Sequence, residues 1–168
     1  MTTEDNWKPV SAAGVAAGWG FIGLIIWLRA SSPDAWVRIL DDANLVFHEA
    51  GHPLVGLFSN RLMVYGGTLG QLVFPAVCSV SFWRRREPVA LALCLTWFFE
   101  NFLNIARYMA DARAQLLPLV GGAEHDWTEI FSRWGVLPHD TTLAAFTAFL
   151  GWAGMIGCGL WLLWRSRI

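Results

Sequence analysis

The longest uncharged stretch of the chain is the feature that most constrains its fold. Between Ser11 and Leu28 no residue is charged, and a helix needs about 20 apolar residues to cross a hydrocarbon core of roughly 30 Å. A membrane-spanning helix is therefore expected here. A cleaved signal peptide is the alternative, but the chain begins with Thr2-Thr3-Glu4-Asp5 instead of a basic stretch, and no typical cleavage site follows Trp27. We expect the helix to be retained.

The composition places the whole chain in the same class. Of its 168 residues, 55% are hydrophobic and 15% are charged, which is too apolar for an ordinary soluble domain. The net charge of −1 argues against nucleic acid as a partner, because nucleic-acid binding calls for a basic face. A lipid bilayer is the expected partner, and the 11 Trp residues suit anchoring at its interfaces. The sequence does not indicate an oligomeric state.

The apolar runs predict about five membrane spans. They cover residues 10–28, 33–58, 68–83, 88–111 and 141–164. A further short helix is expected between Asp111 and Asp140. There the apolar side chains Trp127, Ile130, Phe131 and Trp134 recur on one helical face, as in a helix lying at the membrane interface. Because no repeat or linker divides the chain, residues 1–168 are predicted to form one domain, an all-α, polytopic transmembrane helix bundle with one short interfacial helix.

Clusters of arginine indicate how such a bundle would be oriented. Residues 84–86 are all arginine, and Arg165 and Arg167 lie near the end of the chain. Basic residues favour the cytoplasmic side of a membrane, so both clusters are expected there. Five spans then place the N-terminus outside and the C-terminus inside. The expected location is the cytoplasmic (inner) membrane of a bacterium.

The second predicted span carries the motif His48-Glu49-Ala50-Gly51-His52. Two histidines four residues apart project from one face of a helix and can share a metal ion, and Glu49 is a candidate general base beside them. In a zinc hydrolase, zinc lowers the pKa of its bound water and polarises the carbonyl under attack. Ionisable groups inside a span cost roughly 2.5 kcal/mol or more each, so inert packing is a poor explanation for this motif.

Together with a second stretch, this motif resembles the site-2 protease type of intramembrane zinc metalloprotease. The matching residues are Phe47 to His52 and then Gly66-Gly67-Thr68-Leu69-Gly70-Gln71-Leu72. The resemblance covers residues 44–73 and implies a Zn²⁺ cofactor and an endopeptidase that cleaves a membrane protein or peptide. Family members carry a Gly-Pro-x-x-Asn element whose amide helps to hold the substrate carbonyl. Gln71 is its counterpart here, although the proline is missing.

The sequence offers two candidates for the third zinc ligand. A catalytic zinc usually takes three protein ligands, and the family's Asn-x-x-Pro-x-x-x-Leu-Asp-Gly stretch, which supplies an aspartate, does not occur intact. Residues 104–111 match part of it and offer Asp111. Residues 115–126 match another part and offer His125. We favour His125, because neutral imidazole is a common zinc ligand, and keep Asp111 as the alternative.

Asp126 has a competing structural interpretation. With Glu129 three residues later, it forms a capping-box-like start to the short helix, so it is expected to act as a cap. Asp111 or Asp126 can also serve as the carboxylate partner that orients His125.

A polar stripe is expected on the fourth span. Glu100, Asn104, Arg107 and Asp111 fall on one helical face, so they are predicted to face inward. Two interpretations of Arg107 stay open. It either serves water or substrate access, or it neutralises Glu100 and Asp111 inside the bundle.

Other functions and one further element complete these expectations. The stretch Leu62-Met63-Val64-Tyr65 is a candidate edge strand that would pair with an unwound substrate segment. One alternative function keeps the zinc but hydrolyses a lipid or a small amide. Another is a non-catalytic membrane protein in which the motif forms a structural metal site.

Overall fold

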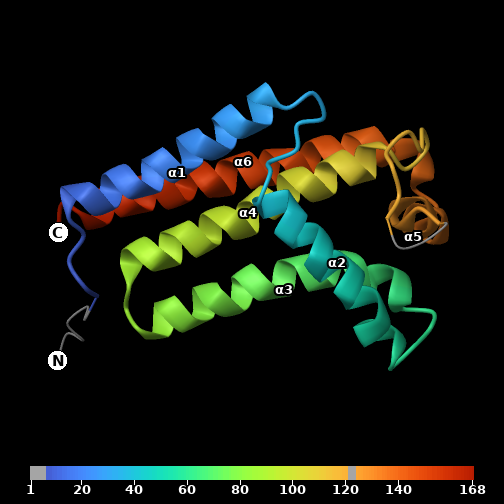
Figure 1. Ribbon diagram of the computed structural model, residues 1–168, viewed down its shortest axis with the longest axis horizontal. Coiled ribbons are helices and arrows are strands. Elements are labelled where there is room, and N and C mark those ends of the chain that lie inside the picture. Colours follow the sequence, from blue (N-terminus) through green and yellow to red (C-terminus); the bar gives the residue numbers. More distant parts are fainter. Residues whose placement is uncertain (1–6, 121–123) are drawn as a thin grey trace.

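The computed structural model of the chain describes residues 7–120 and 124–168, and these residues are all-α (Figure 1). The helices are α1 (Ala12–Ser31), α2 (Leu40–Gly56), α3 (Met63–Arg84), α4 (Pro88–Ala110), α5 (Asp126–Trp134), the 3₁₀ helix η1 (Leu137–His139) and α6 (Asp140–Arg165). The described residues contain no strand. The predicted all-α class is therefore confirmed, and the strand predicted at residues 62–65 is wrong, because α3 begins at Met63.

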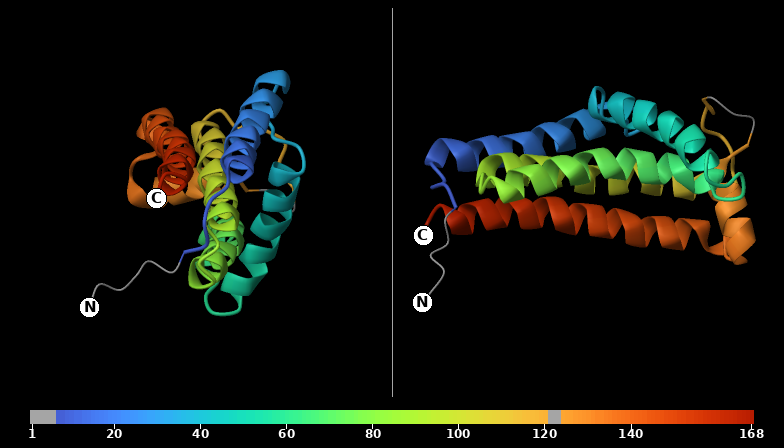
Figure 2. Two further views of the ribbon diagram at one scale, coloured as in Figure 1. Left: turned by 90° about the vertical axis from the view of Figure 1, so that its left-hand side faces the viewer. Right: turned by 90° about the horizontal axis from the view of Figure 1, so that it is seen from below.

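Four segments of the described chain are long and apolar enough to cross a membrane: α1, α3, α4 and the stretch Leu137–Arg165 that contains α6. They run side by side along the long axis of the molecule (Figures 1 and 2). This arrangement is that of a multi-pass membrane protein. About five spans were predicted, and α2 is the one that does not qualify. It has 17 residues, begins at Leu40 instead of residue 33, and carries Asp41, Asp42 and Glu49.

Two carboxylates set the start of α2. Asp41 Oδ2 accepts a hydrogen bond from Val37 N at 2.7 Å, and Asp42 Oδ2 accepts one from Ile39 N at 3.3 Å. Both acids lie in the first turn of the helix, where they also face the positive end of its dipole. The sequence between residues 32 and 39 is therefore a folded-back connection, and α2 begins part-way along the bundle (Figure 1).

The two ends of the described chain meet at one end of the bundle, opposite α5 (Figure 1). Lys8 N donates to Arg86 O at 3.0 Å, and Lys8 Nζ pairs with Glu87 Oε1 at 2.7 Å. The Arg165 guanidinium lies 5.7 Å from the centre of the Trp7 ring. This arrangement differs from the expectation of termini on opposite sides of the membrane, because four crossing helices, not five, would return the chain to the side where it began.

Helices α2 and α3 pack backbone against backbone at three glycines. A Cβ added to Gly51 would lie 2.0 Å from Gly66 O, and one added to Gly70 would lie 2.3 Å from Phe47 O. Small residues permit such close approach between membrane helices. Gly66 and Gly67 are therefore part of helix α3, and Gly66 lies in its contact surface with α2. This close contact holds α2 against the first turns of α3.

The predicted interfacial segment is confirmed as a helix, α5, which crosses the end of the bundle (Figure 2). Its apolar face is buried in protein, because Trp127, Ile130 and Phe131 are 8%, 1% and 0% exposed. They form one core cluster with residues of α4 and α6, including Met109 and Ala144. This packing fixes the start of α5, which is where the chain enters the candidate site.

Candidate metal centre

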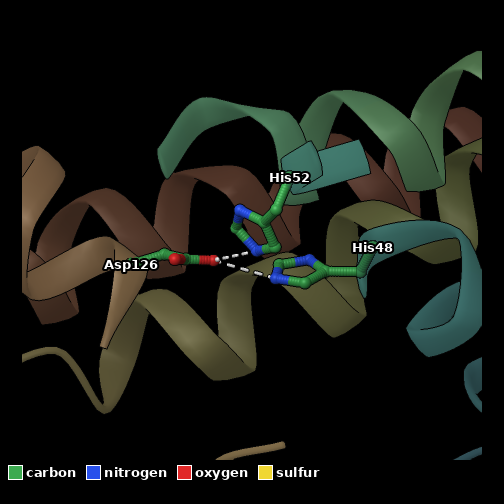
Figure 3. A group of neighbouring side chains, drawn as sticks. All are labelled: His48, His52 and Asp126. Carbon is green, nitrogen blue, oxygen red and sulfur yellow. Dashed lines mark hydrogen bonds and ion pairs between the residues drawn. The ribbon is translucent and has the colours of Figure 1, made fainter. Parts of the chain in front are cut away.

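Three side chains from two distant parts of the sequence converge where α2 meets the start of α5 (Figure 3). His48 Nε2 lies 2.8 Å from Asp126 Oδ2, and His52 Nε2 lies 3.2 Å from the same oxygen. His48 is buried and the other two are partly buried, and their ligand atoms all lie within 4.8 Å of one another. In the part of the chain that the structure describes, this is the group of His, Cys, Asp or Glu that could hold a metal ion.

The hydrogen bonds on the far side of each imidazole determine which nitrogen faces the carboxylate. His48 Nδ1 lies 2.9 Å from Gln71 Oε1, and His52 Nδ1 lies 2.9 Å from Met63 O. A carbonyl oxygen only accepts, so each Nδ1 is the donor and carries the proton. Each Nε2 then presents its lone pair towards Asp126. Metal-binding histidines have this arrangement, in which an oxygen acceptor fixes the ring.

A glycine of α3 leaves the space in front of the two imidazoles open. A Cβ added to Gly67 would lie 2.4 Å from His48 Nε2 and 2.6 Å from His52 Nε2. Any other residue would thus place carbon against both lone pairs. The close approach of α3 at this position therefore requires glycine, and the opening it leaves is a cradle at the Nε2 atoms.

The donor set fits a divalent metal ion. Two imidazole nitrogens and one carboxylate oxygen are a known catalytic zinc set, and ligand atoms about 2.0–2.1 Å from a tetrahedral zinc are roughly 3.3 Å apart. The separations of 2.8 and 3.2 Å from Asp126 are close to that value. Burial raises the pKa of the Asp126 carboxyl, but its contacts with the two imidazoles of His48 and His52 outweigh burial and hold that pKa below its usual value. The carboxylate is therefore ionised and suited to a cation.

The structure gives His125 a different task from the one predicted. Its Nδ1 accepts a hydrogen bond from Thr128 N at 3.3 Å, which makes it the N-cap of α5. Its Nε2 lies 3.4 Å from Asp111 Oδ2, and the residue is 3% exposed. Burial lowers the pKa of His125, and Asp111 offsets only part of that shift. His125, predicted as the third ligand, is thus placed outside the group that contains His48 and His52.

Asp111, the alternative third ligand, is also engaged elsewhere. Its two carboxylate oxygens accept hydrogen bonds from Leu116 N at 2.9 Å and Leu117 N at 3.0 Å. It supports the chain that follows α4 and serves as a partner of His125, which agrees with the orienting role considered for it. Among the described residues, Asp126 is the carboxylate that lies beside the two histidines and could complete a metal site. The interpretation of Asp126 as the helix cap is wrong, because His125 fills that role.

Tyr108 connects this region and was missed in the sequence. Its hydroxyl accepts a hydrogen bond from Asp126 N at 3.2 Å, and its ring lies 4.1 Å from the His125 ring and 5.9 Å from the His48 ring. No motif signals a tyrosine at this position. Asp126, by contrast, could have been found from the sequence, because it is the last residue of the stretch 115–126 that matches part of the family's ligand-bearing stretch.

His48, His52 and Asp126, called the metal-binding group below because they could hold a metal ion, line a cavity of about 870 Å³. This size is typical of ligand sites. Glu49 lines this cavity, and its carboxylate makes no hydrogen bond or ion pair with any described residue. Gln71 also lines it, and its side chain is 3% exposed. The Gln71 amide nitrogen donates to Asn104 Oδ1 at 3.5 Å, so this residue orients His48 from one end and contacts α4 from the other.

The polar stripe predicted on α4 faces inward as expected. Asn104 and Arg107 line the cavity, whereas Glu100 is fully buried and accepts a hydrogen bond from Asn44 of α2 at 3.2 Å. Part of the stripe therefore belongs to the cavity wall, and Glu100 belongs to a buried polar contact between α2 and α4.

Comparison of the chain with protein families, with curated proteins and with solved structures found no match.

Proposed function

We propose that this protein is a zinc-dependent intramembrane endopeptidase that hydrolyses peptide bonds of membrane-associated substrates. The observation that carries the proposal is the convergence of His48, His52 and Asp126 on one point, with the carboxylate of Glu49 in the same cavity. The two Nε2 lone pairs face that point, and Gly67 leaves it open. A metal site with a free carboxylate beside it is the arrangement that hydrolysis requires.

Each residue then has a distinct chemical role. His48, His52 and Asp126 would hold the ion, and the carbonyl oxygens of Gln71 and Met63 keep the two rings in the ligating orientation. Zinc, when bound, supplies a Lewis acid that activates water and polarises the scissile carbonyl. Glu49 accepts the proton of the attacking water and returns it to the departing amine.

The position of the site supports a membrane-associated substrate. The cavity is lined by residues of α3 and α4, two of the helices that are long and apolar enough to cross a membrane. We propose that α2 enters the bilayer of a bacterial cytoplasmic membrane part-way, as a fifth membrane-inserted helix. The motif then lies towards one membrane surface, within reach of a peptide segment that leaves the bilayer.

Glu49→Gln tests the proposal. We expect purified protein with this substitution to keep its zinc, measured by elemental analysis, and to lose cleavage of a mixture of membrane-protein peptides by at least about 100-fold, because the general base is removed. Cleavage products are measured by mass spectrometry. The control is Glu129→Gln, which changes another cavity-lining carboxylate that is paired with Arg133 at 2.7 Å and is expected to leave cleavage nearly unchanged.

Two results would contradict the peptidase. Absence of zinc after zinc supplementation would remove the metal site altogether. Zinc that is bound and needed for stability, in a protein whose peptide cleavage is absent or is unaffected by Glu49→Gln, would favour the structural metal site. Release of a lipid or small-amide product that depends on Glu49 would favour the other hydrolase.

A further inference from the structure

Arg107 lies in the cavity wall beside the candidate metal centre. It shares a face of α4 with Asn104, since positions three apart on a helix are neighbours, and Tyr108 follows it directly in the sequence. Asn104 contacts the Gln71 amide at 3.5 Å, and the Tyr108 ring lies 5.9 Å from the His48 ring. All three α4 residues line the cavity. The guanidinium is thus carried by the same helical face that contacts the metal-binding group.

No carboxylate of the described chain pairs with Arg107. Its own helix offers two candidates, but Glu100 accepts its hydrogen bond from Asn44 at 3.2 Å, and Asp111 is occupied by the amides of residues 116 and 117. Among the described residues, no ion pair within 4.0 Å involves Arg107. The interpretation that Arg107 neutralises these two acids is therefore not supported. An unpaired cation on a membrane helix is costly and is usually functional.

The Arg107 side chain is nevertheless held in place. Its guanidinium carbon lies 5.4 Å from the centre of the Trp36 ring, and Trp36 Nε1 donates to Asp42 Oδ1 at 2.8 Å. A guanidinium stacked on an aromatic face keeps the N–H groups at its edge available for a planar, bidentate partner. The Trp36 ring thus holds the Arg107 guanidinium in place in the cavity wall, with its N–H donors available.

The other arginine in the described cavity wall provides a contrast. Arg133 Nε donates to Glu129 Oε1 at 2.7 Å, and its Nη1 donates to the carbonyl oxygen of Arg61. Arg133 is thus neutralised by a carboxylate of its own helix. Between the two, only Arg107 is free to pair with a negative group that enters the cavity.

We infer that Arg107 binds a carboxylate of the substrate, so that the peptidase prefers peptides with an acidic side chain or a free C-terminal carboxylate near the cleaved bond. The inference rests on the proposed function and adds the class of substrate to it. A carboxylate matches the planar donor fork of arginine, and in a peptide it comes from one of these two sources.

Three peptide hydroxamates of otherwise identical sequence test this inference. One is neutral with an amidated C-terminus, one carries a single Glu with an amidated C-terminus, and one is neutral with a free C-terminal carboxylate. Their hydroxamate groups bind the zinc, and affinity is measured on zinc-loaded protein in nanodiscs. We expect at least one carboxylate probe to bind about tenfold more tightly than the neutral probe, and the tighter one identifies the source of the carboxylate.

Substitutions then assign the preference to Arg107. Arg107→Gln should remove the difference between the probes while zinc content and the affinity of the neutral probe stay unchanged. Arg107→Lys should keep only part of it, because an ammonium is a point charge without a planar fork. Arg133→Gln is the matched control and should keep the full preference. The lysine variant preserves the charge and serves as the second variant if the glutamine variant does not fold.

Failure of this inference is distinguishable from failure of the proposed function. Equal affinity of all three probes for the wild type, or a preference undiminished in the Arg107 variants, overturns the role of Arg107 and leaves the zinc site intact. A wild type that binds neither zinc nor any of the probes overturns both.

Discussion

His125 and Asp126 are adjacent in the sequence but have different surroundings. His125 is buried, caps α5 through Nδ1, and faces Asp111. Asp126 is the first residue of α5 and points back to the two histidines of α2 (Figure 3). The side chains of neighbouring residues at a helix start diverge, so a shift of one position decides which of them meets the metal-binding group.

The first prediction concerns this choice of ligand. Asp126→Asn should lower zinc affinity by at least about tenfold, because it removes the only negative ligand of the group. His125→Gln should keep one zinc per chain. Zinc per protein after dialysis against a competing chelator, measured on detergent-purified variants, checks this. The reverse result, with zinc lost in His125→Gln and kept in Asp126→Asn, would restore His125 as the third ligand.

A second prediction at this scale concerns Gly67. Gly67→Ala should abolish zinc binding, because the added methyl would lie 2.4 Å from His48 Nε2. The control is Gly20→Ala in α1, where an added Cβ meets nothing within 4 Å, and alanine there should stabilise the helix by up to about 1 kcal/mol. Elemental analysis and thermal unfolding of both variants give the two readouts. Normal zinc content in folded Gly67→Ala would show that the cradle is not at the Nε2 atoms.

At the scale of elements, the contact between α2 and α3 determines the site. The two histidines lie on α2, whereas Gln71, Met63 and Gly67, which orient or accommodate them, lie on α3. The site therefore depends on the register of one helix against the other. The glycines at their contact fix this register by allowing the backbones to touch.

Gly51 tests this contact. In Gly51→Ala the new methyl would lie 2.0 Å from Gly66 O, and a backbone oxygen cannot rotate away as a side chain can. We expect a loss of at least about 3 kcal/mol of unfolding free energy, the upper part of the range for overpacking, together with weaker zinc binding. Thermal or denaturant unfolding in detergent measures the change, with Gly20→Ala again as the control. Wild-type stability would mean that α2 and α3 are not in backbone contact.

At the scale of the whole molecule, the number of crossing helices decides where the two ends of the chain lie. Residues 7 and 8 contact the turn between α3 and α4 and the last turn of α6, and α5, which begins with Asp126, lies at the opposite end (Figure 1). Lys8 thus joins the arginine-rich end of the bundle, which favours the cytoplasm.

This arrangement predicts that both termini lie on the same side of the membrane. Reporter fusions at the two ends, or labelling of single introduced cysteines with an impermeant reagent in intact cells, should give the same side for both. The cytoplasmic side is expected from the basic residues there. Termini on opposite sides would mean that the chain crosses the membrane an odd number of times and that α2 spans it fully.

Several parts of this protein followed from the sequence itself. Long apolar runs predict α1, α4 and α6, because a helix satisfies its own backbone in an apolar medium and needs only length and composition. The spacing of His48 and His52 puts both on one helical face, because that relation lies within a single helix. The inward stripe of α4 and the helical nature of residues 126–134 follow from the same periodicity.

Only the tertiary structure decided the rest. The length of α2 depends on hydrogen bonds from the backbone N–H groups of the preceding loop to the carboxylates of Asp41 and Asp42. The third helix begins at Met63, before the predicted residue 68, and its glycines pack on α2. The carboxylate that lies beside the two histidines comes from a helix 78 residues after His48, and whether His125 or Asp126 reaches the histidines depends on how the apolar face of α5 docks on α4 and α6. Local patterns carry no information about such docking, because it is set by packing between segments that are distant in the chain.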